Sequence, residues 1–343
     1  MWHIYIMKQS VDWRIRPGRS TDGVGEPPSP RGFTFICDAG RPVGRACVLE
    51  SDGFFHLVDL AVDPDWRRRG IGRALVSAVE SEVISRGATA LTLLTGEAGF
   101  FSRLGYEKEC LPVALRWLAT PELQAMSRPL ADPVVPRPAV SVIPLRDGPS
   151  GLEVFAQHRV GTMDFAAGAV VFPGGRIDPP DHEQRLELPP HLVDAWSSTA
   201  LPPAEVLVAA GIREVAEECD VLLSPTDLIP WDNWVTPPGG RRRFDVAFFL
   251  THVRDEDAPR WANSSTESLR SSWDRVTTLL ADESAGRIRL LPPTLALLTE
   301  LAEFTSAADA LTHAPPIVPV LDDSAVRPRP AGGLSPSLST RQH

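Results

Sequence analysis

The sequence predicts an α/β (α+β) protein built from two domains. Its 343 residues exceed the usual length of one domain. Turn-bounded apolar runs in the first third are typical of an antiparallel sheet, and a glycine-containing basic loop and a helix pattern follow them. In the second half, a β-type run stops at a Pro-Gly-Gly turn, and a helix with an acidic face comes later. We therefore expect one sheet with helices in each half.

Composition narrows the classes of function. Hydrophobic residues make up 43% of the chain, and the net charge of −10 argues against nucleic-acid or anionic-membrane partners. The four cysteines are scattered, so they predict neither a zinc site nor a disulfide framework. The apolar run at residues 1–8 is too short for a signal peptide or a membrane span. These features predict a cytoplasmic protein, and the strong preference for arginine over lysine indicates a bacterial one.

The first domain is expected over residues 1–118. Residues 1–31 are rich in Gly, Pro and Ser and are expected to be irregular, apart from a short strand at 13–16. Turn-bounded apolar runs then predict an antiparallel meander with strands at 33–37, 43–49 and 56–62.

A phosphate cradle is predicted directly after the meander. A basic loop containing Gly70 and Gly72 opens a helix in which Leu75, Val79 and Val83 form one apolar stripe. The loop N–H groups and the positive end of the helix favour an anion, and glycines let a pyrophosphate approach the main chain. The expected cofactor-binding residues are Val62, Arg67, Arg68, Arg69, Gly70, Ile71, Gly72 and Arg73.

The order Val62-Asp63-Pro64, then Arg67-x-x-Gly70-x-Gly72, resembles the acetyl-CoA loop of the GNAT family of N-acetyltransferases. The strand at 90–95 and the run 98–106 resemble the second half of that family. Their sequence, Leu-Leu-Thr followed by Phe-Phe-x-Arg-Leu-Gly-Tyr, is similar to the arsenic-resistance acetyltransferase subgroup. The resemblance implies a GNAT-like mixed sheet, acetyl-CoA as co-substrate and an amine acceptor that the sequence does not identify.

The residues leave the activity of this domain open. Phe101 stands near the position where many acetyltransferases of this fold carry a Tyr that protonates the departing thiolate. His56 and Asp59 are candidates for a general base, although a lone His on a strand is more often a core or surface residue. The stretch 17–31 stands where the family has two helices that wall the acceptor site. A catalytic acyltransferase and a CoA-binding sensor or docking module are both compatible with the sequence.

The second domain is expected over residues 138–313. Residues 119–137 alternate Pro with small and charged residues and predict an interdomain linker. Residues 314–343 predict a loosely held, Pro/Ser-rich tail. Strands are expected near 139–145, 152–159 and 244–250, and helices after Asp274 and at Pro292.

A helix with an acidic face is predicted in the middle of this domain. Its apolar face comprises Val208, Ile212, Val215 and Cys219. Arg213 can neutralise Glu217, whereas Glu214 and Glu218 face each other as a like-charge pair. A hard divalent cation, Mg²⁺ or Mn²⁺, would relieve that repulsion, and a solvated acidic face is the alternative. The expected metal ligands are Glu214, Glu217 and Glu218.

The Pro-Gly-Gly turn and this helix together resemble the Nudix box. Gly175 takes the first position of the box, and Asp181 stands where its first Glu is expected. The run from Arg213 to Glu218 matches the core of the box. Asp220 replaces the Gly that follows, which is tolerable because Asp can adopt the left-handed cap conformation.

Residues 182–212 lengthen the spacer of the box. This split box is similar to the Nudix subgroup that includes the peroxisomal coenzyme A diphosphatases. Further pieces of the subgroup are echoed at 163–168, 234–237, 243–245 and 291–294. We expect the 182–212 insert to be a substrate-recognition excursion outside the core sheet.

The resemblance implies a metal-dependent diphosphatase acting on CoA or an acyl-CoA, with nucleotide sugars and dinucleotides as alternatives. The implied catalytic residues are Arg213, Glu214, Glu217 and Glu218, and the implied substrate loop comprises Gly174, Gly175 and Asp181. Arg213 is expected to orient the glutamates through Glu217. Asp245 and Glu267 are candidates for the general base. Three hypotheses follow: a two-headed enzyme, a hydrolase with a CoA-binding module, and a non-catalytic scaffold, against which the intact Arg-Glu pattern argues.

Overall fold

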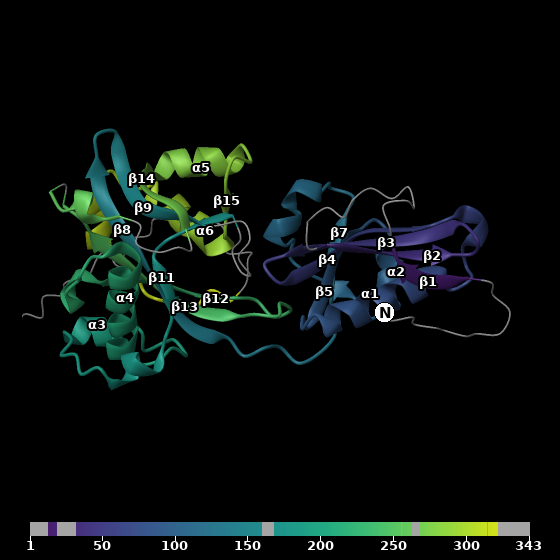
Figure 1. Cartoon of the computed structure of the whole chain (residues 1–343), viewed down its shortest axis with the longest axis horizontal. Coiled ribbons are helices and arrows are strands. Elements are labelled where there is room, and N and C mark those ends of the chain that lie inside the picture. The colour runs from purple at the N-terminus through teal and green to yellow at the C-terminus, as the bar shows by residue number, and fades with distance from the viewer. Residues whose placement is uncertain are drawn as a thin grey trace, which may run out of the picture.

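The computed structural model describes residues 13–18, 32–159, 168–254, 256–262, 268–313 and 315–321. Two sheets lie in separate halves of the molecule, each with its own helices (Figure 1). The predicted two-domain α/β architecture is therefore confirmed.

The first sheet has seven strands in the order β1-β2-β3-β4-β5-β7-β6. Its strands are β1 (Arg14–Pro17), β2 (Phe33–Asp38), β3 (Pro42–Ser51), β4 (Phe54–Val62), β5 (Ala90–Thr95), β6 (Glu107–Lys108) and β7 (Gln124–Pro129). Only the β4–β5 pair is parallel, so the sheet is mixed as expected. The helical elements are η2 (Pro64–Trp66), α1 (Ile71–Ser85), α2 (Ala98–Ser102) and η3 (Val113–Leu118).

Helix α1 forms the core of this domain together with the sheet. Its predicted stripe of Leu75, Val79 and Val83 is fully buried, each side chain being 0% exposed. Because these positions recur every four residues, they lie on one face of the helix and meet the apolar face of the strands. The helix therefore holds the loop that precedes it against the end of β4.

The predicted linker is wrong in part. Within 119–137, Gln124–Pro129 forms β7, which pairs with β5 along six positions and also with β6. Ala125 and Met126 of this strand are buried. The first domain therefore extends past residue 118, and its sheet is incomplete without β7.

The second sheet has the order β12-β13-β8-β9-β10-β15, with β11 pairing with β8 and β14 with β9. Its strands are β8 (Arg137–Gly148), β9 (Gly151–Arg159), β10 (Ala169–Val171), β11 (Gly174–Arg176), β12 (Ile229–Val235), β13 (Phe244–His252), β14 (Ser268–Arg275) and β15 (Arg289–Leu290). The α-helices are α3 (Pro190–Asp194), α4 (Ala204–Cys219), α5 (Val276–Ser284), α6 (Pro292–Leu301) and α7 (Ala307–Thr312). Three short 3₁₀ helices among the described residues are η4 (Pro179–Glu183), η5 (Pro225–Asp227) and η6 (Ala258–Arg260).

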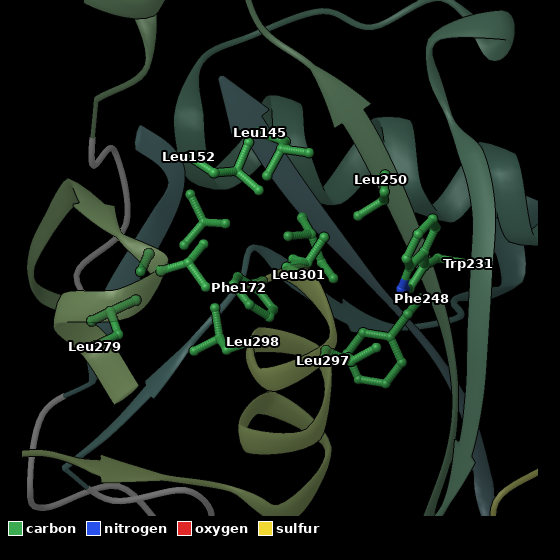
Figure 2. Packing of buried hydrophobic residues seen from close by; sticks show 14 of the residues in the cluster. Leu145, Leu152, Phe172, Trp231, Phe248, Leu250, Leu279, Leu297, Leu298 and Leu301 are labelled. Carbon is green, nitrogen blue, oxygen red and sulfur yellow. The ribbon is translucent and has the colours of Figure 1, made fainter. Parts of the chain in front are cut away.

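Two hydrophobic cores lie on opposite faces of this sheet. Alternate residues of β9 enter different cores, because Val154 and Ala156 face α5 and α6 whereas Phe155 faces α4. Figure 2 shows the first of these cores, in which Leu297, Leu298 and Leu301 of α6 meet the sheet. The arrangement is the expected α/β/α sandwich, with α4 on the face where the candidate site lies and α3 beside it.

Within the described residues, the 182–212 insert supplies no strand of the sheet, but the expectation that it is an excursion away from the domain core is wrong. Helix α4 begins at Ala204, so the last third of the insert is the buried first half of that helix. Trp196 is only 5% exposed, and its ring centroid lies 5.0 Å from that of Phe249 in β13. The insert therefore supplies part of the core beside α4.

The expected loose tail is also partly ordered. Ile317 is 6% exposed, and its carbonyl accepts a hydrogen bond from the Ser198 hydroxyl at 2.6 Å. Val320 exchanges backbone hydrogen bonds with Asn233 and Val235 beside β12. Residues 315–321 thus pack against the domain. Across the part of the chain that the structure describes, none of the helices combines the length and apolarity that crossing a bilayer requires.

Candidate functional site

Two close-packed glycines bring the Pro-Gly-Gly turn against α4. A Cβ at Gly174, where φ is +155°, would lie 2.3 Å from the carbonyl oxygen of Val140. A Cβ at Gly175 would lie 2.3 Å from Oε1 of Glu214. Only a glycine fits at position 174, because the clash there is with backbone, whereas a Cβ at position 175 would require the Glu214 carboxylate to move. The turn and the acidic helix are therefore in direct contact, as the sequence pattern predicts.

Arg213 joins three separate segments at this contact. Its Nε and Nη2 donate to the two carboxylate oxygens of Asp181, both at 2.9 Å. Its Nη1 donates to Glu214 at 2.8 Å, and Nη2 also donates to the carbonyl of Arg176 at 2.9 Å. The distance to Glu217 is 3.5 Å. The expectation that Arg213 acts mainly through Glu217 is therefore wrong, because its short bonds go to Asp181 and Glu214.

Asp181 is built into the site. Its side chain is 3% exposed and also accepts from the N–H of Asp178 at 2.8 Å, which closes the first turn of η4. Burial opposes ionisation of Asp181, but the Arg213 bonds and the Asp178 N–H outweigh it and hold the pKa of this carboxyl below its ordinary value. Asp181 therefore stays ionised and fixes the Arg213 guanidinium in a bidentate bond.

Glu214 and Glu218 are partly withdrawn from water. Burial raises the pKa of Glu214, although Arg213 opposes the rise. Burial also raises the pKa of Glu218 to about 7, and the charge of Glu214 adds to the increase. The Gly174 N–H donates to Glu218 at 3.1 Å and opposes it. The like-charge interaction expected between these two residues is therefore present, and it adds to the cost of desolvating them.

The donors suit a hard divalent cation, but the described residues do not form a closed ligand set. Carboxylate oxygens are the ligands that Mg²⁺ prefers, and burial raises the pKa of two of the three expected donors, Glu214 and Glu218. Glu217 is 60% exposed at its side chain. Within the described ranges, no group of three or more His, Cys, Asp or Glu side chains is arranged to hold a metal. The chemistry fits, and the metal assignment stays a prediction.

Two residues of β9 that the sequence did not single out lie beside Glu218. Gln157 is 3% exposed and lies against Glu218 and Cys219, and both it and Arg159 oppose the rise in the pKa of Glu218. They occupy alternate positions after Phe155, so they share the α4 face of the strand. That alternation was the available signal, but nothing in the sequence indicates that β9 lies under α4.

The structure does not single out either candidate for the general base, Asp245 or Glu267. Asp245 is 9% exposed, accepts from the Asn233 amide at 2.6 Å, and has a pKa raised by burial. Glu267 lies outside the described residues, and so does most of the 163–168 stretch. The assignment of a general base stays a prediction.

In the first domain, β4 and β5 diverge beside the predicted cradle. The two strands pair at His56–Thr92 and Leu57–Leu93. Among the described residues, they do not pair beyond these positions. Gly70 caps α1 with φ +83°, and a Cβ there would meet no neighbour within 4 Å. The loop before α1 is therefore accessible to a ligand, and left-handed backbone at Gly70 explains the glycine.

The remaining cradle residues have structural roles as well. Arg67 donates to the carbonyl of Val62 at 3.2 Å, and the Arg69 guanidinium lies 4.8 Å from the Trp66 ring centroid. A Cβ at Gly72 would lie 3.3 Å from the Phe100 ring. Gly72 thus also permits close packing of α1 on α2. Arg68 has φ +60°, and Arg73 is exposed.

Of the two candidates for a general base in this domain, His56 is buried and Asp59 is not. Phe101 is 5% exposed and packs edge-on against Tyr106. Burial and the bond to Glu80 raise the pKa of Tyr106 far above its ordinary value. His56 is 2% exposed, bonds Thr92 through Nδ1, and has a pKa lowered to about 4 by burial. Asp59 is paired with Arg45. Phe101, Tyr106 and His56 are thus inaccessible to solvent, whereas the Asp59 side chain is 38% exposed within its ion pair.

The comparisons with known proteins agree with these two halves. A family model described as an acetyltransferase (GNAT) domain matches residues 30–108. An uncharacterized N-acetyltransferase of Chlorobaculum tepidum is 43% identical over 83 residues, which cover 23% of this chain and 54% of that protein. "Putative nudix hydrolase 7" of Caenorhabditis elegans is 28% identical over 158 residues, which cover 41% of this chain and 53% of that protein. The chain thus spans about half the length of the curated relatives it matches.

Among solved structures, a NUDIX hydrolase from Alicyclobacillus acidocaldarius is 24% identical, with a TM-score of 0.42, covering 52% of this chain and 96% of that one. The subgroup resemblances, to arsenic-resistance acetyltransferases and to coenzyme A diphosphatases, stay predictions. The two curated relatives carry the names of a hydrolase and an N-acetyltransferase. Residues 30–108 thus match the GNAT acetyltransferase domain model, and the chain is also similar to a Nudix hydrolase.

Proposed function

We propose that the second domain is a Mg²⁺- or Mn²⁺-dependent hydrolase that cleaves a diphosphate in a nucleoside-diphosphate-linked compound. The observation that carries this proposal is the hydrogen bonding of Arg213. Its guanidinium donates to Asp181, to Glu214 and to the carbonyl of Arg176 at 2.8–2.9 Å. A solvated acidic face would not need a bidentate arginine, a buried aspartate and two glycines packed against Val140 and Glu214.

The residues divide the work between them. Asp181 holds Arg213, and Arg213 holds Glu214, so this part of the site is preorganised. Glu218 holds the turn through the Gly174 N–H. Glu214, Glu217 and Glu218 would bind the cation, which when bound neutralises phosphate charge and lowers the pKa of a water molecule. The positive charge of Arg159, at the end of β9, acts on Glu218 and favours its ionised form.

CoA or an acyl-CoA is the substrate that we favour, because the long spacer within the box is similar to the coenzyme A diphosphatase pattern. The test is hydrolysis by the purified full chain with Mg²⁺, offered CoA, acetyl-CoA, ADP-ribose, NADH and nucleotide sugars. We expect metal-dependent release of adenosine 3′,5′-diphosphate from CoA. Preference for another diphosphate would change the substrate, and no hydrolysis of any of them would reject the proposal.

We also propose that the first domain binds acetyl-CoA at the 67–72 loop and transfers the acyl group to an amine. A second candidate is a CoA-binding sensor or docking module without catalysis. The buried Phe101 and the inaccessible His56 and Tyr106 favour this second candidate. Acetyl transfer by the full chain to a panel of amines distinguishes the two, because only the acyltransferase produces CoA in proportion to the amine.

Gly70→Asp and Gly72→Asp are expected to weaken acetyl-CoA binding at least about tenfold, because each adds a negative charge where the pyrophosphate should lie. Isothermal calorimetry on the folded variants measures the effect. Gly40→Asp is the matched control for Gly70, since Gly40 has φ +84° and also has open space around its Cβ position. Unchanged binding by both loop variants would show that the ligand does not use this loop.

A further inference from the structure

The turn between β12 and β13 reaches from the second domain to the first (Figure 1). The carbonyl of Gly239 accepts from the N–H groups of Thr89 at 2.8 Å and Ala90 at 3.2 Å. The N–H of Arg241 donates to the carbonyl of Gly53 at 3.3 Å. Main-chain bonds thus connect this turn to the start of β5 and to the turn that precedes β4.

Charged side chains reinforce the same contact. Glu50 is 6% exposed at its side chain, and it lies between Arg86 of its own domain at 4.0 Å and Arg241 of the other at 3.4 Å. Asp52 forms a second ion pair across the contact with Arg289. Removing one partner of a buried carboxylate strongly destabilises a protein. The pairing of Glu50 with Arg241 therefore favours the docked arrangement.

Packing against the first domain explains why positions 239 and 240 of the turn are glycines. Gly239 has φ +117°, and a Cβ there would lie 3.1 Å from the Ala90 side chain. A Cβ at Gly240 would lie 3.1 Å from the Phe54 ring. All the atoms found near these two Cβ positions belong to the first domain. The two glycines at the tip of the turn therefore allow the first domain to pack closely against it. They are not required by packing within the second domain.

We propose that the 236–243 turn is a docking element for the first domain, and that it makes the two domains unfold as one cooperative unit. The consequence is that a ligand of the first domain also stabilises the second. β4 starts at Phe54 under the turn and ends at Val62 directly before the proposed acetyl-CoA loop, so the contact and the loop lie at opposite ends of one strand. The ligand consequence rests on the proposed acetyl-CoA binding, whereas the docking itself does not.

Scanning calorimetry of the full chain tests the docking, with hydrogen exchange to report which domain opens. We expect one transition for the wild type and two for Gly240→Val, separated by about 5 °C or more. Arg241→Ala is the second variant, because it removes the cross-domain partner of Glu50 without crowding the contact. Gly96→Val is the control, since it makes the same change at a glycine whose Cβ would enter open space and whose φ is not left-handed. Two transitions in the wild type, or one transition in both variants, would overturn the proposal.

Adding acetyl-CoA provides the ligand measurement. In the wild type, the single transition should shift upward as a whole, whereas in Gly240→Val only the transition of the first domain should shift. If the ligand shifts both transitions of the variant equally, the turn does not transmit the effect. If acetyl-CoA shifts nothing in the wild type, the proposed cofactor is wrong, and the number of transitions still decides whether the turn docks the domains.

Discussion

Glu218→Gln and Glu217→Gln are each expected to lower kcat for diphosphate hydrolysis by about a hundredfold or more. Glutamine keeps the shape and the helix propensity of the side chain but removes the charge that a hard cation needs. At position 218 it can still accept the Gly174 N–H, so the turn should stay in place. Steady-state kinetics at saturating Mg²⁺, with denaturant unfolding in parallel, separates loss of the site from loss of the fold.

Glu218→Gln should also stabilise the metal-free protein at alkaline pH. The pKa of Glu218 is raised from 4.5 to about 7 in the folded state, so the folded chain binds more protons than the unfolded chain between these values. The free energy of unfolding therefore falls as the pH rises through this window, and the glutamine variant escapes that fall. We expect a gain of about 1–3 kcal/mol at pH 8 and little change at pH 4.

Glu205→Gln is the matched control, because it makes the same chemical change in the first turn of α4. Its activity should be close to that of the wild type, and its stability should fall by no more than about 1 kcal/mol through loss of a favourable helix-dipole interaction. Wild-type hydrolysis by both the Glu217 and Glu218 variants would mean that the acidic face of α4 is only solvated surface.

Arg213→Leu is expected to lower the free energy of unfolding by about 3–5 kcal/mol. Asp181 would be left 3% exposed without its bidentate partner, and Glu214 would lose the bond that offsets its burial. Arg213→Lys keeps the charge but cannot span both oxygens of Asp181, so it should fall between leucine and the wild type. Urea unfolding at pH 7 measures all three proteins.

Two further variants make this result specific. Arg254→Ala removes an arginine that is 68% exposed in its ion pairs, and it should cost no more than about 1 kcal/mol. Adding Asp181→Asn to Arg213→Leu should cost less than the sum of the single changes, because the second change removes the charge that the first one strands. Strict additivity would show that Arg213 and Asp181 do not depend on each other.

Local pattern was sufficient for much of the fold. The apolar stripes of α1 and α4 follow from residues spaced three and four apart. The α1 stripe is buried as predicted, and the α4 stripe is buried except for Ile212, which is half-buried. The Pro-Gly-Gly turn and the left-handed Asp220 at φ +56° follow from the backbone preferences of those residues. These features depend on neighbours within a few positions, so the sequence alone determined them.

Tertiary structure decided the features that depend on distant partners. The short run Gln124–Pro129 has a weak local signal, and it becomes a strand because β5 and β6 offer it hydrogen bonds. Trp196 is core only because it meets Phe249, and Arg213 chooses Asp181 over the helical neighbour Glu217 because η4 brings that carboxylate within 2.9 Å. Likewise, Gln157 has a role only because it lies against Glu218 of α4, and Gly240 only because it packs against Phe54 of the first domain. Periodicity within a segment reports which face is buried, but only the packed chain determines what lies against that face.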